Sequence, residues 1–131
     1  MKYLSAEDVL LLHNMAVDES GGLHGLRDLG LLESAVARPQ ASFGGQDLYP
    51  NIFLKAGTLI HGLLRNHPFV DGNKRTSVYS AMTFLELNCY CFEAEQKEVV
   101  NFALKVENEK LPVEEIAKWL KEHTKKVKKL K

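Results

Sequence analysis

Apolar residues recur every three to four positions along most of the chain, which is the spacing of one face of an α-helix. The clearest stripe lies between about residues 51 and 65 and consists of Ile52, Ala56, Leu59, Ile60 and Leu63. Phe53 and Leu54 make the opposite face of the same segment apolar. Since a helix that is apolar on most sides is buried, this pattern predicts the central helix of the domain.

Three further stripes predict three more helices towards the C-terminus. One helix is expected from about residue 73 to residue 87, and its buried face carries Val78, Met82 and Leu85. The next carries the apolar set Val99, Phe102, Ala103 and Val106. The last begins near Pro112, a residue that suits a first helical turn. Its apolar stripe is Val113, Ile116, Ala117 and Leu120.

Capping residues delimit two helices near the N-terminus. Ser5 followed by Asp8 is a variant of the capping box, and the two glycines at 21 and 22 should end the helix that it begins. Asp28 is expected to cap a second helix. This helix should stop before Pro39, because the residue before a proline avoids the α region.

These elements together predict an all-α fold, a single compact domain of about six helices over residues 1–124. Residues 40–49 are expected to form a glycine-containing connector, either a surface loop or a small β-hairpin. Residues 125–131 form a basic tail, whose lysines are Lys125, Lys126, Lys128, Lys129 and Lys131. We expect this tail to be solvated; the alternative is a weak contact with nucleic acid or an acidic partner.

Composition excludes several classes of protein. A hydrophobic fraction of 45% and a charged fraction of 26% are ordinary for a globular protein. A net charge of zero argues against a dedicated nucleic-acid binder, so nucleic acid is not expected as a partner. The sequence contains no apolar run of about 18 residues, so no membrane span is expected.

The cysteines and most of the histidines are expected to be structural. Cys89 and Cys91 alone make neither a zinc site nor a disulfide framework, and we interpret them as reduced packing residues of a cytoplasmic protein. His13 and His24 are expected on the surface or a helix flank, since no potential metal ligand has matching spacing. His61, on the central helix, is also interpreted as structural.

Residues 67–76 are different, because they concentrate chemically active side chains between the two predicted central helices. The segment reads His-Pro-Phe-Val-Asp-Gly-Asn-Lys-Arg-Thr. Gly72 would free the backbone at a tight turn, and Asn73 is the expected N-cap of the following helix. The N-terminus of that helix presents unpaired N–H groups and therefore attracts anions.

The charges in this segment point to a nucleotide. Lys74 and Arg75 have the wrong sign for the N-terminal end of a helix dipole, a cost that a bound polyanion would offset. Asp71 supplies a hard oxygen ligand, which suits Mg²⁺ bridging to phosphates. His67 can take a proton near neutral pH. The segment therefore predicts a magnesium–nucleotide site with a histidine base.

The signature loop of the Fic/Doc family resembles the pattern His67-x-Phe69-x-Asp71-Gly72-Asn73-Lys74-Arg75. The lysine variant resembles the Doc, or death on curing, toxin branch of the family. The run from Leu26 to Pro39 is also similar to the N-terminal part of Doc-type proteins, so the resemblance covers nearly the whole chain. It implies the helical Fic/Doc fold, with ATP and Mg²⁺ as cofactors.

The resemblance also implies roles for individual residues. His67 would deprotonate an acceptor Ser or Thr, and Asp71 would hold Mg²⁺. Lys74 and Arg75 would stabilise charge in the transition state, which makes them catalytic together with His67. The residues that would hold the nucleotide phosphates are Gly72, Asn73, Lys74 and Arg75.

Two positions favour phosphate transfer over AMP transfer. The adenylylating Fic pattern has a glycine where this chain has Lys74 and a second arginine where it has Val78. The Doc branch is similar to this chain at both positions. It phosphorylates elongation factor Tu on a threonine, so the resemblance implies a translation-arresting toxin kinase. The alternatives are a Fic-type protein adenylyltransferase and a catalytically idle interaction module.

The resemblance implies two protein partners. One is a translation factor similar to elongation factor Tu, which the family's flap, here residues 40–49, would dock by strand addition. The other is a separate Phd-like antitoxin that docks in a groove. An antitoxin is expected because the sequence lacks the family's inhibitory motif Ser/Thr-x-x-x-Glu-Gly/Asn.

Overall fold

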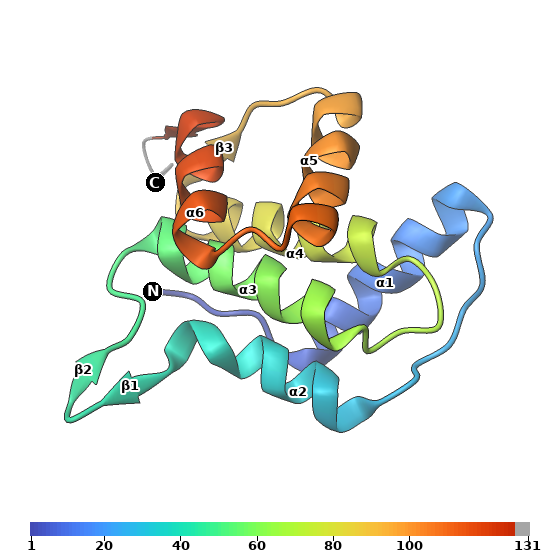
Figure 1. The fold of residues 1–131 in the computed structure, drawn as a ribbon, viewed down its shortest axis with the longest axis horizontal. Helices are drawn as coiled ribbons and strands as arrows, with labels where there is room; N and C mark the ends of the chain where they lie inside the picture. The colour runs from blue at the N-terminus through green and yellow to red at the C-terminus, as the bar shows by residue number, and fades with distance from the viewer. Residues whose placement is uncertain (128–131) are drawn as a thin grey trace.

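Helix α3 (Ile52–Asn66) runs through the middle of the molecule in the computed structural model, which describes residues 1–127 (Figure 1). Ten of its 15 residues are buried, as its two-sided apolar pattern predicts. Gly57 lets α6 approach closely, since a Cβ there would lie 3.1 Å from the carbonyl oxygen of Val113 and 3.2 Å from the nitrogen of Ala117. The central helix is therefore fixed by packing on more than one side.

Five further α-helices surround α3; three match the predicted apolar stripes, and the two near the N-terminus match the predicted capping residues. They are α1 (Ala6–Ser20), α2 (Leu29–Ala37), α4 (Asn73–Leu87), α5 (Gln96–Glu109) and α6 (Val113–Glu122). A short 3₁₀ turn, η1 (Arg38–Gln40), follows α2 and contains Pro39. In Figure 1, α2 lies on one side of α3 and α6 on the other. The prediction of a mostly helical domain with six helices is confirmed over residues 1–127.

The expected caps are present. Ser5 and Asp8 form a capping box in which each side chain bonds the other residue's backbone N–H. Gly21, with φ +75°, follows Ser20 and ends α1 in the left-handed conformation, as the glycines at 21 and 22 predict. The Asp28 carboxylate accepts from the Leu31 N–H at 3.0 Å and begins α2.

Strands β1 (Ser42–Phe43) and β2 (Gln46–Asp47) form the small hairpin that was one of the two interpretations of residues 40–49. It projects from the body near the start of α3, whereas residues 67–72 lie beyond the other end of that helix (Figure 1). Lys55 of α3 anchors the hairpin, since its buried ammonium donates to Asp47 at 3.2 Å and to the carbonyl of Pro39 at 2.9 Å.

A second two-stranded antiparallel sheet was not predicted. It pairs β3 (Tyr90–Phe92) with β4 (Thr124–Lys126). Each strand has three residues, too few to establish an alternating pattern in the sequence. Lys125 and Lys126, assigned to the basic tail, thus lie in β4 opposite Cys91 and Tyr90. The other tail lysines lie outside the described residues.

Two further observations bear on the class of protein. Among residues 1–127, no helix combines the length and apolarity that a bilayer crossing requires. Cys89 and Cys91 are both free thiols, and Cys91 is exposed, so it is not the packing residue that we expected.

Candidate functional site

The loop between α3 and α4 carries the predicted site and is held in an unusual backbone conformation. His67 caps the C-terminus of α3 with φ +45° and ψ +59°, in the left-handed region. Gly72 is the N-cap of α4 with φ +78°. A Cβ at Gly72 would lie 3.1 Å from Cγ2 of Val17, so both the conformation and the close approach of α1 require glycine.

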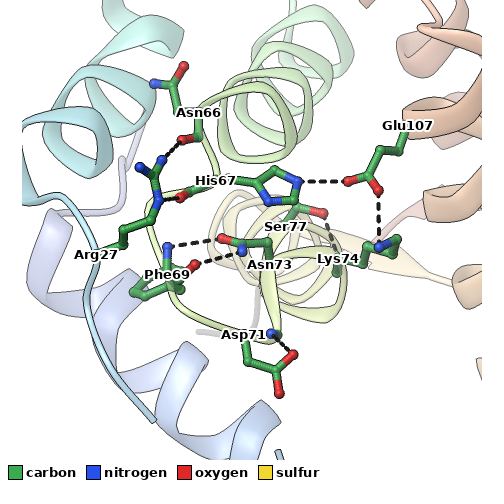
Figure 2. Close-up of polar contacts among 10 residues, drawn as sticks. Arg27, Asn66, His67, Phe69, Asp71, Asn73, Lys74, Ser77 and Glu107 are labelled. Atoms are coloured by element: carbon green, nitrogen blue, oxygen red, sulfur yellow. Dashed lines mark hydrogen bonds and ion pairs between the residues drawn. The ribbon is translucent and has the colours of Figure 1, made fainter. Parts of the chain in front are cut away.

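Arg27 holds the backbone at the start of this loop. Its Nε donates to the carbonyl oxygen of His67 and its Nη2 to that of Asn66, both at 2.7 Å (Figure 2). The backbone N–H of Arg27 also donates to the carbonyl of Pro68 at 2.7 Å. These bonds satisfy carbonyls that the end of α3 leaves unpaired. Arg27 thereby fixes the position from which the His67 side chain projects.

The neighbouring backbone continues this pairing. The Val70 N–H donates to the carbonyl of Gly25 at 3.0 Å, and an antiparallel bridge joins Leu26 to Phe69. A Cβ at Gly25 would lie 2.9 Å from Cγ2 of Val70. Residues 22–28, which we call the template segment, therefore run alongside the loop at backbone distance.

Asn73 does not cap α4, and that prediction is wrong. It is the first residue of the helix, and its buried side chain points back into the loop (Figure 2). Its Oδ1 accepts from the Phe69 N–H at 3.1 Å, while its Nδ2 donates to the Phe69 carbonyl at 2.9 Å. Both polar atoms of the amide thus hold the loop closed around Phe69.

His13 is buried, so the expectation that it lies on the surface or a helix flank is also wrong. Its ring stacks on Phe69 with 3.8 Å between centroids, and its Nε2 donates to the carbonyl oxygen of Asp71 at 2.8 Å. His13 follows Val9 by four residues, on the buried face of α1. The helical period therefore predicts that His13 is buried, but we expected it on the surface or a helix flank because histidine is polar.

His24 and His61 are placed as expected. His24 is exposed and lies 2.7 Å from Asp18. His61 meets the guanidinium of Arg38 at 3.0 Å. Burial, together with the nearby positive charge of Arg38, lowers the pKa of His61 and so favours its neutral form.

Asp71 places a carboxylate at the cavity while accepting two backbone bonds. Its Oδ2 accepts from the Leu23 N–H at 3.0 Å and its Oδ1 from the Gly72 N–H at 2.9 Å. These bonds, led by that from Leu23, hold the pKa of the Asp71 carboxyl below its usual value, so the group is ionised at neutral pH. A Cβ at Gly22 would come within 2.6 Å of Oδ2, so a larger residue there would have to displace this carboxylate.

This carboxylate fits a metal ion that arrives with phosphates. Within residues 1–127, no group of three or more His, Cys, Asp or Glu side chains could hold a metal. Mg²⁺ commonly keeps several waters and takes one or two protein carboxylates plus substrate phosphates. Asp71 therefore suits Mg²⁺ bound to a nucleotide and does not suit a metal held by the protein alone.

All six predicted site residues line one cavity of about 370 Å³. They are His67, Asp71, Gly72, Asn73, Lys74 and Arg75. The opposite wall comes from α5 and includes Val99 and Ala103. Among residues 1–127, no side chain caps the N-terminus of α4, so the backbone N–H groups of its first turn remain available to an anion.

Glu107 on α5 is a site residue that the sequence analysis missed. Its Oε2 lies 2.9 Å from Nε2 of His67, and its Oε1 lies 3.0 Å from Nζ of Lys74 (Figure 2). Partial burial raises the pKa of Glu107, but the hydrogen bonds from His67 and Lys74 outweigh it and lower the pKa overall. No local pattern marks this residue, because it is 40 positions from His67 in the chain.

Comparison with known proteins gives one family match and two curated relatives. Residues 3–85 match the Fic/DOC family. The chain is 51% identical over 87 residues to "Toxin Doc" of Mycolicibacterium smegmatis. The aligned region covers 66% of this chain and 65% of that protein. It is 34% identical over 88 residues to "Protein kinase doc" of Escherichia phage P1, covering 67% of this chain and 69% of that protein.

Proposed function

The chain belongs to the Fic/Doc family, and from this premise we propose that it transfers the γ-phosphate of ATP to a Ser or Thr hydroxyl of another protein. The observation that carries the proposal is the cavity at the N-terminus of α4, where a base, a carboxylate, two cations and free backbone N–H groups meet. One similar protein bears the name of a protein kinase, which supports the same reaction.

The first turn of α4 would bind the phosphates. Its unpaired N–H groups and the positive end of the helix dipole favour anions. Lys74 and Arg75 add full charges at the same turn, and both line the cavity. Gly72 has no side chain to keep a phosphate away from this backbone. The Asn73 side chain, already bonded to Phe69, would contribute by shaping the loop and through its own backbone N–H.

Asp71 is the residue that would hold the magnesium ion. An ion held there would supply positive charge that offsets the negative charge of the phosphates. The protein's own contribution is to keep the carboxylate ionised and oriented, through the bonds from Leu23 and Gly72.

His67 would act as the general base. It would take the proton from the acceptor Oγ as this oxygen attacks the γ-phosphorus, and the bond from that phosphorus to the β–γ bridging oxygen would break to release ADP. His67 lines the cavity, and the Arg27 side chain holds its left-handed backbone in place. A base in a fixed position contributes about 10²–10⁴-fold in rate.

Lys74 and Val78 favour γ-phosphate transfer over AMP transfer. Lys74 adds bulk and charge at the turn where the adenylylating pattern has glycine. Val78 is fully buried beside the cavity and offers no bidentate clamp where that pattern has arginine. The site can thus neutralise a terminal phosphate but lacks one of the groups that orient a nucleotide for AMP transfer.

In the cell, this activity would make the chain the toxin of a toxin–antitoxin pair. One relative is named a toxin, which supports this role. The acceptor would be a translation factor similar to elongation factor Tu, and a Phd-like antitoxin would cover a groove of the free protein.

Two ATP analogues test the proposed reaction. Purified elongation factor Tu is incubated with the protein and each analogue, and its capacity to support translation is then measured. An α,β-methylene analogue blocks AMP transfer but leaves the γ-phosphate transferable, so we expect it to support inactivation. A β,γ-methylene analogue blocks γ-phosphate transfer and should not. Inactivation with only the β,γ-methylene analogue would contradict the proposal.

A further inference from the structure

We propose that Glu107 is a positioning residue for His67: its carboxylate fixes which ring nitrogen of His67 accepts the proton and stabilises the imidazolium that results. The inference rests on the proposed function and deepens it, because it names a residue that acts through the base. The juxtaposition that carries it is one carboxylate of α5 bonded both to His67, at the end of α3, and to Lys74, at the start of α4.

Glu107 contacts both residues at once, one through each oxygen of its carboxylate. Oε2 of Glu107 lies 2.9 Å from Nε2 of His67, and Oε1 lies 3.0 Å from Nζ of Lys74. Figure 2 shows the imidazole and the lysine side chain both directed at Glu107, while Asp71 lies at the far end of the loop. Only 28% of the Glu107 side chain is exposed, against 46% for His67 and 39% for Lys74. Glu107 thus has the least exposed side chain of the three.

The charge of Glu107 decides the tautomer of His67. Two hydrogen bonds keep the pKa of Glu107 low, so it is ionised at neutral pH and can only accept. Nε2 of His67 must therefore carry a hydrogen in this contact, and Nδ1 carries the lone pair. The geometry assigns the role of base to Nδ1.

The contact between Glu107 and His67 also stabilises the ring while it takes the proton from the acceptor hydroxyl. When Nδ1 takes the proton of the acceptor Oγ, the ring becomes a cation, and its Nε2–H already points at a carboxylate. No reorganisation is then needed to stabilise the new charge. The other carboxylate oxygen keeps Lys74, the proposed phosphate ligand, at a fixed place relative to the base. Glu107 thereby sets the distance between two reacting partners.

Kinetics separate this role from that of a simple surface ion pair. Glu107→Gln has nearly the same shape and no charge, and its amide can donate to Nε2 and so favour the other tautomer. We expect kcat to fall about 10²-fold while the KM for ATP changes by no more than about threefold. Glu109→Gln, an exposed site on the same helix, is the matched control and should keep the wild-type kcat. Glu107→Asp, which keeps the charge, should recover part of the lost rate.

A measurement without substrate distinguishes failure of this inference from failure of the proposed reaction. Nitrogen-15 spectra of the five histidines, with His67→Ala to assign the signal, report the tautomer of His67 directly. We expect the Nε2–H tautomer in the wild type and in Glu109→Gln, and its loss in Glu107→Gln. An unchanged tautomer or an unchanged kcat in folded Glu107→Gln would overturn the role of Glu107. If the wild type transfers no phosphate, the tautomer alone decides whether Glu107 orients His67.

Discussion

At the scale of single residues, the site depends on side chains that hold other groups in place. Arg27 binds the carbonyls at the end of α3, Asn73 closes the loop over Phe69, and His13 supports the loop from α1. None of the three needs to touch a substrate to matter. Catalysis tolerates little displacement of a base or a phosphate ligand, so residues that fix the backbone affect the rate as well as stability.

Arg27 offers a test at this scale. Arg27→Lys keeps the charge but cannot reach both carbonyls with a planar fork, and Arg27→Ala loses both bonds. Because Arg27 is exposed, we expect a stability loss of only about 1 kcal/mol for either variant, measured by denaturant unfolding. The kcat should fall by more than the small loss of folding stability would cause, since the backbone of His67 is no longer held. Two variants with wild-type kcat would show that the loop keeps its shape without this clamp.

The site residues that the sequence identified are neighbours in the chain, whereas those that it missed are distant in the chain and close only in the fold. The loop from His67 to Arg75 was identifiable because its chemistry is contiguous in the chain. Glu107 and Arg27 act across 40 positions, and only tertiary packing brings them to His67. Asn73 was misassigned because an amide at a helix start suits either a cap or a loop bridge, and sequence alone does not choose between them.

At the scale of elements, the site lies where the end of α3, the start of α4, one face of α5 and the template segment meet. The six helices were predictable because four have a clear apolar stripe and the first two begin at capping residues. Strands β3 and β4 were not predictable, since their pairing joins residues more than 30 positions apart. The template segment has no regular structure, yet it fixes the loop between α3 and α4 through backbone hydrogen bonds. No pattern in the sequence predicts these bonds.

The docking of the template segment should depend on pH through Asp71. The folded-state pKa of this carboxyl is lowered from 3.8, so the stability that it contributes is present above this value and is lost as pH falls through the folded pKa. Asp71→Asn removes the charge and keeps the shape. We expect the wild type to exceed Asp71→Asn in Tm by a constant margin above about pH 5, and by a shrinking margin below pH 3.8.

A margin in Tm that widens as pH falls would contradict this account of Asp71. Hydrogen exchange of the Leu23 amide provides a local control, since that N–H donates directly to the carboxylate. Its protection should decrease in Asp71→Asn at neutral pH.

At the scale of the whole molecule, the proposed reaction and the proposed target contact lie at opposite ends of α3. The hairpin β1–β2 is anchored near the start of this helix through Lys55, and the loop follows its end (Figure 1). A helix of 15 residues is about 22 Å long. A target segment paired with the hairpin would need about seven further extended residues to bring a hydroxyl to His67. A folded target protein can span this distance more readily than a short peptide.

The most direct test of the central claim, that the loop around His67 transfers the terminal phosphate, is to follow the γ-phosphate and the α-phosphate of ATP separately. Elongation factor Tu is incubated with the protein and ATP labelled at either the γ- or the α-phosphate. We expect label on the target only from the γ position, and its loss by about 10²–10⁴-fold in rate with folded His67→Ala. Label arriving from the α position alone, or undiminished transfer by His67→Ala, would contradict the account.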